Sequence, residues 1–334
     1  MKISYDYSLR NFNTFGIAVK AKEYIRLESI KEAKVFFSGG GSGRGKCLIL
    51  GGGSNILFTG DFDGTIIQPA FNSIEIIKAG PSAVHLSAEA GLKWDSLVEW
   101  AVRNEFGGLE NLSYIPGNVG AAPIQNIGAY GVEVAEHIKA VHTLSLDSGK
   151  VHHFTRKECE FGYRDSIFKK ELKNKHLIYK VEFTLHRQNQ TYKLSYGNLE
   201  ESAMEDGRIT LEGIRNAVIR TRKEKLPDPD ITGNAGSFFK NPLVEKSKYE
   251  ELVMHHPGMP SWQTGPGKYK IPAAWLIEKA GWKGKKSGRA GVHEKHALIL
   301  INLGDAEGRE ILELSNMIAE SVYSGFGISL EKEV

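Results

Sequence analysis

The stretch NLSYIPGNVGAAPIQNIGAYGVEV, residues 111–134, decides how the rest of the chain is interpreted. It contains four glycines, two prolines and little charge, and it lies between an amphipathic helix pattern and a strand pattern. Its recurring apolar residues argue against disorder, and a loop of this length in a globular chain is typically a binding loop. The glycines allow positive φ angles and a close approach of the backbone to a ligand. The stretch therefore predicts a backbone cradle for a large flat cofactor with a diphosphate; the alternative is a tightly folded Ω-loop without a ligand.

Length and composition indicate a globular protein of two or three domains, because the chain has 334 residues and 41% of them are hydrophobic. The net charge of +3 gives no support for nucleic-acid binding, so we expect no nucleic-acid partner. Cys47 and Cys159 form neither a disulfide framework nor a metal or redox motif, so we expect no metal. The N-terminal residues lack the apolar segment of a signal peptide, and no apolar run is long enough for a membrane span. We therefore expect a cytoplasmic protein, and a monomer.

Helix and strand patterns follow one another without regular β-α-β alternation, which predicts an α+β fold rather than a doubly wound sheet. The clearest helix patterns cover residues 92–105 and 210–225, and the second ends before Pro227. From Asp228 onward glycines, prolines and aromatic residues are mixed with helix patterns, which indicates a further module. The other expected elements are an irregular N-terminal arm, a helix capped by Ser29, strands at 21–27, 47–50, 74–77, 83–88, 176–185 and 297–302, a hairpin around 147–149, helices at about 244–255, 273–281 and 307–324, and a closing C-terminal strand.

Two glycine-rich tracts have the composition of phosphate-binding loops. Gly51-Gly52-Gly53-Ser54-Asn55 follows a strand pattern directly, which is a phosphate-cradling arrangement. Because no amphipathic helix follows it, this tract is not the G-x-G-x-x-G fingerprint of a Rossmann domain. Within the tract 38–46, residues Gly40 to Lys46 spell G-x-x-x-x-G-K, but Cys47 stands where a P-loop has Ser or Thr to hold Mg²⁺. We therefore interpret residues 51–55 as a diphosphate site and residues 38–46 as a flexible turn.

Three segments carry side chains suited to catalysis. Arg164 lies between two strand patterns, where it can bind a carboxylate in a bidentate manner or pair with the neighbouring Asp165. Ser237 lies on a glycine turn, but the turn lacks the G-x-S-x-G pattern and no helix follows at once, which disfavours a hydrolase. Glu331 and Glu333 alternate along the last strand pattern, so one of them can point inward, although such residues are more often solvated.

Two further patterns are weaker. His293-Glu-Lys-His296 misses the H-E-x-x-H zinc signature by one residue, which excludes a zinc protease of that type. The basic residues between 215 and 225 can form a solvated helix face, or some of them can face a diphosphate.

Taken together, several segments resemble the UDP-N-acetylenolpyruvoylglucosamine reductase family, in the family's order and over almost the whole chain. These segments are LGGGSN at 50–55, YIPGNVGAAPIQNIGAYGVEV at 114–134, FGYRDSIFK at 161–169, GNAGSFFKNP at 233–242, WLIEKAGWKG at 275–284 and the closing LEKEV. In addition, SYGNL at 195–199 resembles the tyrosine-bearing loop of the type I branch. The chain stops one residue after Glu333, where relatives continue, so the short last strand can fray.

The resemblance implies an α+β fold of the vanillyl-alcohol-oxidase (PCMH) type, in which two modules bind FAD and a third domain closes over the substrate. The expected modules are residues 1–70 and 71–225, the second completed by the C-terminal strand 327–334, and the expected substrate domain is 226–326. The implied activity belongs to peptidoglycan precursor synthesis: NADPH reduces FAD, and flavin N5 then delivers a hydride to C3 of the enolpyruvyl group of UDP-N-acetylglucosamine enolpyruvate, which gives UDP-N-acetylmuramate.

The resemblance also assigns roles to single residues. Arg164 matches the arginine that stabilises the negative charge on the substrate carboxylate, Glu333 matches the glutamate paired with it, and Ser237 matches the serine that gives a proton to C2. The implied substrate-binding residues are Tyr163, Tyr196, Arg222, Lys225 and Asn241. The implied FAD-binding residues are Leu50, Gly51, Gly52, Gly53, Ser54, Asn55, Ile115, Pro116, Gly117, Gly120, Ala121, Ile127, Gly128, Tyr130 and Gly131.

Two other functions are compatible with parts of the sequence. One is a different FAD-dependent oxidoreductase of the same cofactor fold that acts on a sugar or lactone; the other is a nucleotide-sugar-binding protein without catalysis. Enzymes of the first kind often attach the flavin through His or Cys, but the cluster Gly53-Ser54-Asn55 has neither, so we expect noncovalent FAD. The joint presence of Arg164, Ser237 and Glu333 argues against the second.

Overall fold

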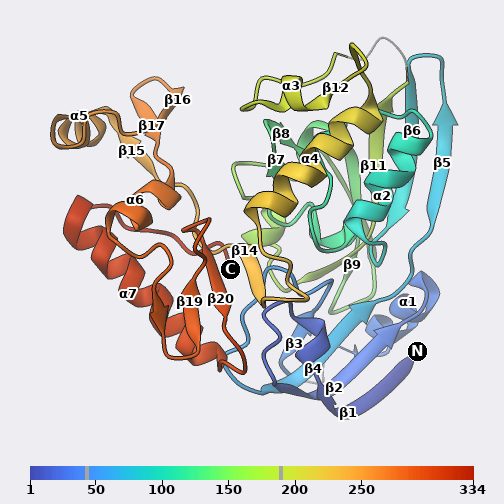
Figure 1. Ribbon diagram of the computed structural model, residues 1–334. Coiled ribbons are helices and arrows are strands. Elements are labelled where there is room, and N and C mark those ends of the chain that lie inside the picture. Colours follow the sequence, from blue (N-terminus) through green and yellow to red (C-terminus); the bar gives the residue numbers. More distant parts are fainter. Residues whose placement is uncertain (42–44, 188–190) are drawn as a thin grey trace. The chain divides into compact units, whose positions relative to one another are not determined.

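The computed structural model describes residues 1–41, 45–187 and 191–334, which separate into two units (Figure 1). The first unit comprises residues 1–7, 21–53 and 62–222, and the second comprises 8–20, 54–61 and 223–334. Each unit combines helices with mostly antiparallel sheets, which confirms the predicted α+β class. Residues 42–44 of the glycine-rich tract 38–46 lie outside the described part of the chain.

The first sheet of the first unit has the order β1-β2-β4-β3. Its elements are β1 (Lys2–Ser8), β2 (Lys20–Leu27), α1 (Ile30–Ser38), β3 (Cys47–Ile49) and β4 (Phe62–Pro69). Both β2 and β3 pair with β4 in parallel, so β2, α1 and β3 form one local β-α-β crossover. As predicted, Ser29 caps α1, because its side chain accepts a hydrogen bond from the Glu32 amide. The expected irregular arm is wrong for residues 2–8, which form an edge strand whose Tyr7 ring stacks on Tyr24.

The second sheet is antiparallel and five-stranded, in the order β10-β9-β11-β6-β5. Its strands are β5 (Ile74–Ala79), β6 (Ala83–Glu89), β9 (Ile138–Ser145), β10 (Val151–Thr155) and β11 (His176–His186). The predicted hairpin around residues 147–149 is confirmed as the β9–β10 turn. One face of this sheet packs against α2 (Trp94–Arg103), whose buried Leu97 and Val98 share a core with Phe183 of β11.

A long helix and several short elements complete the first unit. The helix α4 (Leu211–Lys225) packs on α3 (Leu199–Ala203) through a small core that contains Leu199, Ile214 and Val218. Most of α4 belongs to this unit, and its last three residues belong to the second. The short elements are β7 (Gly128–Ala129), β8 (Val132–Glu133), β12 (Met204–Glu205), β13 (Arg208–Ile209), η3 (Glu110–Leu112), η4 (Val119–Ala121), η5 (Val134–Glu136) and η6 (Ile167–Lys169).

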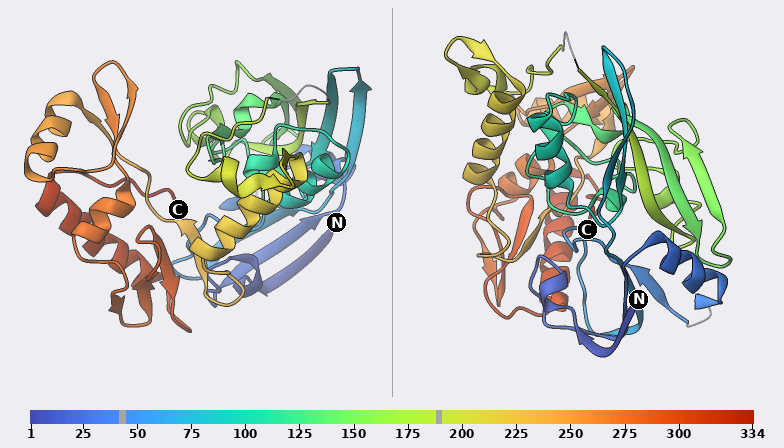
Figure 2. Two further views of the ribbon diagram at one scale, coloured as in Figure 1. Left: turned by 45° about the horizontal axis from the view of Figure 1, so that its top comes forward. Right: turned by 90° about the vertical axis from the view of Figure 1, so that its right-hand side faces the viewer.

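The second unit contains a four-stranded sheet in the order β14-β20-β19-β18 and a three-stranded sheet in the order β15-β17-β16. The buried residues of α7 include Ile311, Leu314 and Ile318, and this helix packs on β19 and β20 (Figures 1 and 2). The elements are η1 (Arg10–Phe12), β14 (Asn234–Ser237), β15 (Leu243–Glu245), α5 (Lys246–His255), β16 (Trp262–Gly265), β17 (Lys268–Lys270), α6 (Ala273–Lys279), β18 (Lys286–Ser287), β19 (Ala290–Val292), β20 (Ile299–Asn302) and α7 (Gly308–Phe326).

Two N-terminal segments belong to the second unit, although we expected them in the first FAD-binding module, residues 1–70. Residues 8–20 pass so close to Gly233 that a Cβ there would lie 2.2 Å from the Phe15 carbonyl oxygen. Residues 54–61 pass equally close to α7, because a Cβ at Gly308 would lie 1.8 Å from the Phe58 carbonyl oxygen. Each segment is thus packed backbone to backbone at a position that only glycine can occupy.

The C-terminal residues 327–334 also belong to the second unit, whereas we expected them to complete the second FAD-binding module. The Lys240 amide donates to the Glu331 carbonyl at 2.9 Å, and the Glu333 amide donates to the Phe238 carbonyl at 2.8 Å. The expected closing strand is reduced to a single β-bridge between Phe239 and Lys332. In the described part of the chain, no helix is long and apolar enough to cross a membrane.

Candidate functional site

The turn Gly51–Gly53 lies against the loop segment 117–121 in the first unit. A Cβ on Gly52 would lie 2.9 Å from Asn118 Oδ1 and 3.0 Å from the Gly117 Cα, so the close approach requires glycine. Gly53 and Gly117 have φ angles of +63° and +113°, which favour glycine as well. The structure therefore brings together two of the segments that the sequence predicted to hold a cofactor.

The loop segment 117–121 is fixed to the backbone between β6 and α2. The Val119 amide donates to the Leu92 carbonyl at 2.9 Å, and the Gly120 amide donates to the Ala90 carbonyl at 3.0 Å. Gly120 has no room for a side chain, because a Cβ there would lie 2.6 Å from the Ala90 Cβ. These bonds leave the segment little freedom to move, which makes it a preformed wall rather than a mobile loop.

The chemistry of this wall fits a diphosphate cofactor. Among the described residues, the amides of Gly51 and Gly52 donate no hydrogen bond to another protein group. Successive backbone N–H groups in a glycine turn form a concavity that binds anions. The predicted residues Gly51 and Gly52 are thus suited to hold the diphosphate of FAD through their amides, and Gly53, Gly117 and Gly120 give the turn and the loop their shape.

The second half of the loop is organised by Asn126, a fully buried residue with a φ of +45°. Its Nδ2 donates to Glu133 Oε2 at 2.7 Å and to the Gly162 carbonyl at 2.9 Å, and its Oδ1 accepts from the Ala135 amide at 3.0 Å. Ser166, also fully buried, donates to the Ile124 carbonyl at 2.6 Å. One asparagine and one serine therefore tie the loop to the segment that carries Arg164.

Arg164 itself reaches the same loop. Its Nη2 donates to the Gly128 carbonyl at 2.7 Å, and its Nη1 donates to the Asn126 carbonyl at 3.4 Å. Its guanidinium carbon lies 5.6 Å from the centre of the Tyr163 ring. The neighbouring Asp165 forms an ion pair with Lys170. The guanidinium is thus oriented by loop carbonyls, beside residues that the sequence predicted to hold FAD.

Asp95, in the first turn of α2, links the start of the loop to α4. Its carboxylate accepts two hydrogen bonds from Arg215, at 2.7 and 2.8 Å, and a third from the Tyr114 amide at 2.5 Å. Burial by itself would raise the pKa of Asp95, but the bonds from Arg215 and Tyr114 outweigh it and hold that pKa below its usual value. Further along α4, Arg222 donates to the Tyr114 carbonyl at 3.1 Å. Asp95 and Arg222 together hold both polar groups of the Tyr114 backbone.

A pair of tyrosines unites a predicted cofactor residue with a predicted substrate residue. The Tyr130 ring meets the Tyr196 ring edge to face, with 5.5 Å between the ring centres. Burial raises the pKa of the Tyr130 hydroxyl, which therefore stays protonated at neutral pH. The nearby positive charge of Arg222 opposes this rise but does not cancel it. Tyr196, by contrast, is 54% exposed and available to a ligand.

In the second unit, Ser237 ends β14 on a turn shaped by Asn234. The Asn234 side chain is buried; its Nδ2 donates to the Thr232 carbonyl at 2.8 Å and its Oδ1 accepts from the Gly236 amide at 3.0 Å. Gly236 has a φ of +71°, which turns the chain just before Ser237. The serine side chain is exposed within this rigid frame.

The other predicted residues of the second unit have mixed surroundings. The Asn241 Oδ1 accepts the Ala273 amide at the start of α6, so part of this side chain is already used in the fold. Lys225 is exposed at the end of α4. Asn55, a predicted FAD residue, donates from Nδ2 to the Glu333 carbonyl at 3.0 Å. The C-terminal segment that carries Glu333 is therefore held in place from two sides.

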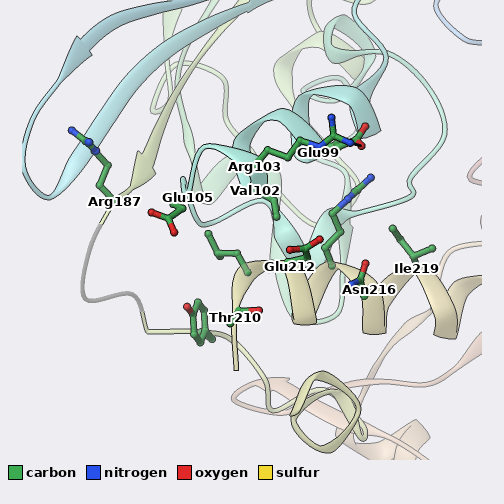
Figure 3. A pocket seen from close by; sticks show the side chains of 12 residues that line it. Glu99, Val102, Arg103, Glu105, Arg187, Thr210, Glu212, Asn216 and Ile219 are labelled. Carbon is green, nitrogen blue, oxygen red and sulfur yellow. Dashed lines mark ion pairs between the residues drawn. The ribbon is translucent and has the colours of Figure 1, made fainter. Parts of the chain in front are cut away.

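A pocket of about 820 Å³ lies elsewhere in the first unit, between α2 and α4 (Figure 3). Its wall includes Glu99, Glu105 and Glu212 together with Arg103 and Arg187. None of the predicted cofactor or substrate residues in the described part of the chain lines it. The pocket is therefore a separate feature from the glycine cradle, which is formed by residues 51–53 and 117–121.

Three residues of the site were not found by the sequence interpretation: Asp95, Asn118 and Asn126. Asp95 lies within the helix predicted at residues 92–105, in which the sequence interpretation assigned no functional residue. The sequence interpretation assigned no role to Asn118 or Asn126, although asparagine is one of the few non-glycine residues that tolerate positive φ. That preference is the only sequence signal for Asn126; nothing local indicates that Asp95 pairs with a residue 120 positions away.

Comparisons with known proteins cover both units. Residues 228–334 match the model of the UDP-N-acetylenolpyruvoylglucosamine reductase C-terminal domain, and residues 25–155 match an FAD binding domain. The chain is 44% identical over 336 residues to a UDP-N-acetylenolpyruvoylglucosamine reductase of Flavobacterium johnsoniae, covering 100% of this chain and 99% of that protein. It is 42% identical to one of Bacteroides fragilis, with 98% of each covered. The crystal structure of UDP-N-acetylenolpyruvylglucosamine reductase (MurB) from Thermus caldophilus is similar, with a TM-score of 0.69, 25% identity, and 99% of this chain and 97% of that chain covered.

Proposed function

The chain belongs to the UDP-N-acetylenolpyruvoylglucosamine reductase family, and we propose that it catalyses the NADPH-dependent reduction of UDP-N-acetylglucosamine enolpyruvate to UDP-N-acetylmuramate. The observation that carries this proposal is the backbone cradle formed in the first unit by residues 51–53 and 117–121, in which a Cβ on Gly52 would lie 3.0 Å from the Gly117 Cα. A cradle of amides without charged side chains suits a cofactor that carries its own negative charge.

FAD, when bound, supplies the hydride that reduces the enolpyruvyl double bond. The residues that would hold it are Gly51 and Gly52, which would offer amides to the diphosphate, and the segment from Ile127 to Gly131, which lies where Arg164 is anchored. Gly53, Gly117 and Gly120 would shape the backbone around it. Because the Gly51 and Gly52 amides bind no acceptor in the part of the chain that the structure describes, they are available to the cofactor. The protein's contribution is to position and polarise the reacting groups.

Arg164 is proposed to stabilise the negative charge that develops on the substrate carboxylate when the double bond is reduced. Its guanidinium is already oriented by the Gly128 carbonyl, so little reorganisation is needed when the charge appears. Glu333 is proposed to act with Arg164 by holding it in the active orientation. Its own segment is fixed by the Phe238 carbonyl and by Asn55, which supports a defined rather than a frayed position.

Ser237 is proposed to donate the proton to C2 of the substrate. A serine hydroxyl is a weak acid, but the carbon that receives the proton is strongly basic, so a well-positioned donor suffices. The rigid turn held by Asn234 and the exposure of the serine support this role. Tyr163, Tyr196, Arg222, Lys225 and Asn241 are proposed to bind the UDP-sugar.

The test separates the two half-reactions. Protein purified with its FAD should be yellow and should be bleached by NADPH without oxygen, and the substrate should restore the colour. Ser237→Ala should keep the first step and slow the second by about 10²- to 10⁴-fold, the usual contribution of a general acid. Ser261→Ala, in the same unit, is the matched control and should behave like the wild type. A colourless protein that takes up no FAD, or a Ser237→Ala variant that fails only in the NADPH step, would refute the proposal.

A further inference from the structure

Three side chains on neighbouring strands of the five-stranded sheet form a cluster that the proposed function does not use. His142 lies on β9, His153 on β10 and Glu182 on β11, and β9 is the central strand of the three. One potential ligand atom of each lies within 4.8 Å of those of the other two. His142 Nε2 is 2.7 Å from Glu182 Oε1, and the two imidazole centres are 4.7 Å apart.

The register of the strands places these side chains on one face. His153 is directly opposite His142 in the β9–β10 pair. The sequence neighbours Val141, Phe154 and Val181 pack in or against the core that α2 covers. Because side chains alternate along a strand, the cluster faces away from that core and from α2.

We propose that His142, His153 and Glu182 bind a divalent transition-metal ion, with Zn²⁺ the best-suited ion, in a three-ligand site that leaves a coordination position open to water. Two imidazoles and one carboxylate form a donor set that zinc accepts. Mg²⁺ and Ca²⁺ prefer oxygen ligands only, so they are poor candidates. The cluster shares no residue with the glycine cradle or with the proposed catalytic groups.

The distances are compatible with such a site after small side-chain rotations. Zinc bonds of about 2.0–2.2 Å in tetrahedral geometry place the donor atoms about 3.4 Å apart. The His142–Glu182 hydrogen bond of 2.7 Å would therefore open by about 0.7 Å, and the exposed His153 would rotate inward. His142 and Glu182 are 14% and 16% exposed, so they are partly shielded and held in place before the ion arrives.

The surroundings limit the affinity rather than prevent binding. Lys180 is the cross-strand partner of His142, and its ammonium opposes a bound cation. The Tyr179 ring lies 5.9 Å from the His142 ring and forms an apolar side of the cluster. An ion bound there would connect three strands, including the edge strand β10, and would stabilise only the folded chain.

The experiment uses the FAD-loaded protein after removal of metals by a chelator. Calorimetric titration with ZnCl₂ should show one site per chain, and the midpoint of thermal unfolding should rise with Zn²⁺ but not with MgCl₂. Loss of a partner that only orients a ligand typically weakens metal binding by about 10- to 100-fold, so loss of a ligand in His153→Ala or Glu182→Gln should weaken it at least about 100-fold.

His152→Ala is the matched control. His152 is the neighbour of His153 on β10, and its ring lies 4.9 Å from the His176 ring instead of the cluster. This variant should bind Zn²⁺ as tightly as the wild type. His153 is exposed, so its removal should leave the unfolding midpoint without metal unchanged. Equal affinity of His153→Ala and wild type, equal weakening in His152→Ala, or a wild type that binds no Zn²⁺ would overturn the proposal.

Discussion

Removal of the Asp95 carboxylate should destabilise the first unit, because this group links α2 to α4 and to the glycine-rich loop. Asp95 accepts three hydrogen bonds, two from Arg215 on α4 and one from the Tyr114 amide at the start of the glycine-rich loop. In Asp95→Ala the Arg215 guanidinium, whose side chain is 11% exposed, loses its counter-charge. The Tyr114 amide loses its acceptor at a residue with a φ of +59°, where the backbone needs such support.

The expected destabilisation follows from these contacts. Breaking a buried ion pair by removing one partner costs about 3–5 kcal/mol. Asp95 is 32% exposed, so water replaces part of the lost interaction and we expect about 2–3 kcal/mol. Alanine recovers about 0.5 kcal/mol of helix propensity. The net loss of unfolding free energy should therefore be about 2 kcal/mol at neutral pH.

Glu99→Ala, one turn further along α2, is the matched control. Glu99 also pairs with an arginine, Arg103, at 2.6 Å, but the two side chains are 43% and 76% exposed. Such a surface pair is worth about 0.5 kcal/mol or less. Urea unfolding of wild type and both variants measures the difference when it is followed by tryptophan fluorescence, to which Trp94 and Trp100 on the same helix contribute.

The difference should also depend on pH. Because the folded-state pKa of Asp95 lies below its usual value of 3.8, its stabilisation is present above pH 3.8 and is lost as the pH falls through the folded-state pKa. The stabilities of wild type and Asp95→Ala should therefore converge in strong acid. An Asp95→Ala variant that loses no more stability than Glu99→Ala at pH 7, or whose loss of stability is the same in acid, would show that Asp95 does not hold α2, α4 and the loop together.

Three further predictions concern other parts of the first unit and its boundary. Gly52→Ala should weaken FAD binding by about 5- to 150-fold, because overpacking costs about 1–3 kcal/mol and distorts the cradle. Gly60→Ala is the control and should leave FAD binding unchanged, because a Cβ there would contact nothing; the dissociation constant from FAD titration of both variants measures the difference. Burial raises the pKa of Cys159 to about 12, so a thiol reagent at pH 8 should modify Cys47 and spare Cys159, as mass spectrometry of the folded protein would show. Burial lowers the pKa of His137 from 6.5 to about 4, so between these pH values the unfolded chain binds more protons than the folded chain. The free energy of unfolding should therefore fall as the pH drops from 6.5 to 4, and urea unfolding of His137→Gln should show a smaller fall.

Local sequence patterns were sufficient for most of the helices and strands. Residues 92–105 were expected as a helix and form α2 at Trp94–Arg103, and residues 176–185 were expected as a strand and form β11 at His176–His186. The reason is that apolar spacing and capping residues act over a few positions. The edge strand β1 was missed although Ile3, Tyr5 and Tyr7 alternate with polar residues, and none of its residues is buried in the structure.

By itself the sequence determined the α+β class, the family and the two glycine-rich segments that form the cradle, because glycine spacing and helical periodicity are local properties of the chain. Only the tertiary structure decided which segments share a unit. Residues 8–20, 54–61 and 327–334 join the second unit through backbone contacts at glycines and bonds far apart in the chain. It also decided the partners of Asp95 and the meeting of His142, His153 and Glu182, because strand pairing and helix packing bring together residues that no local pattern connects.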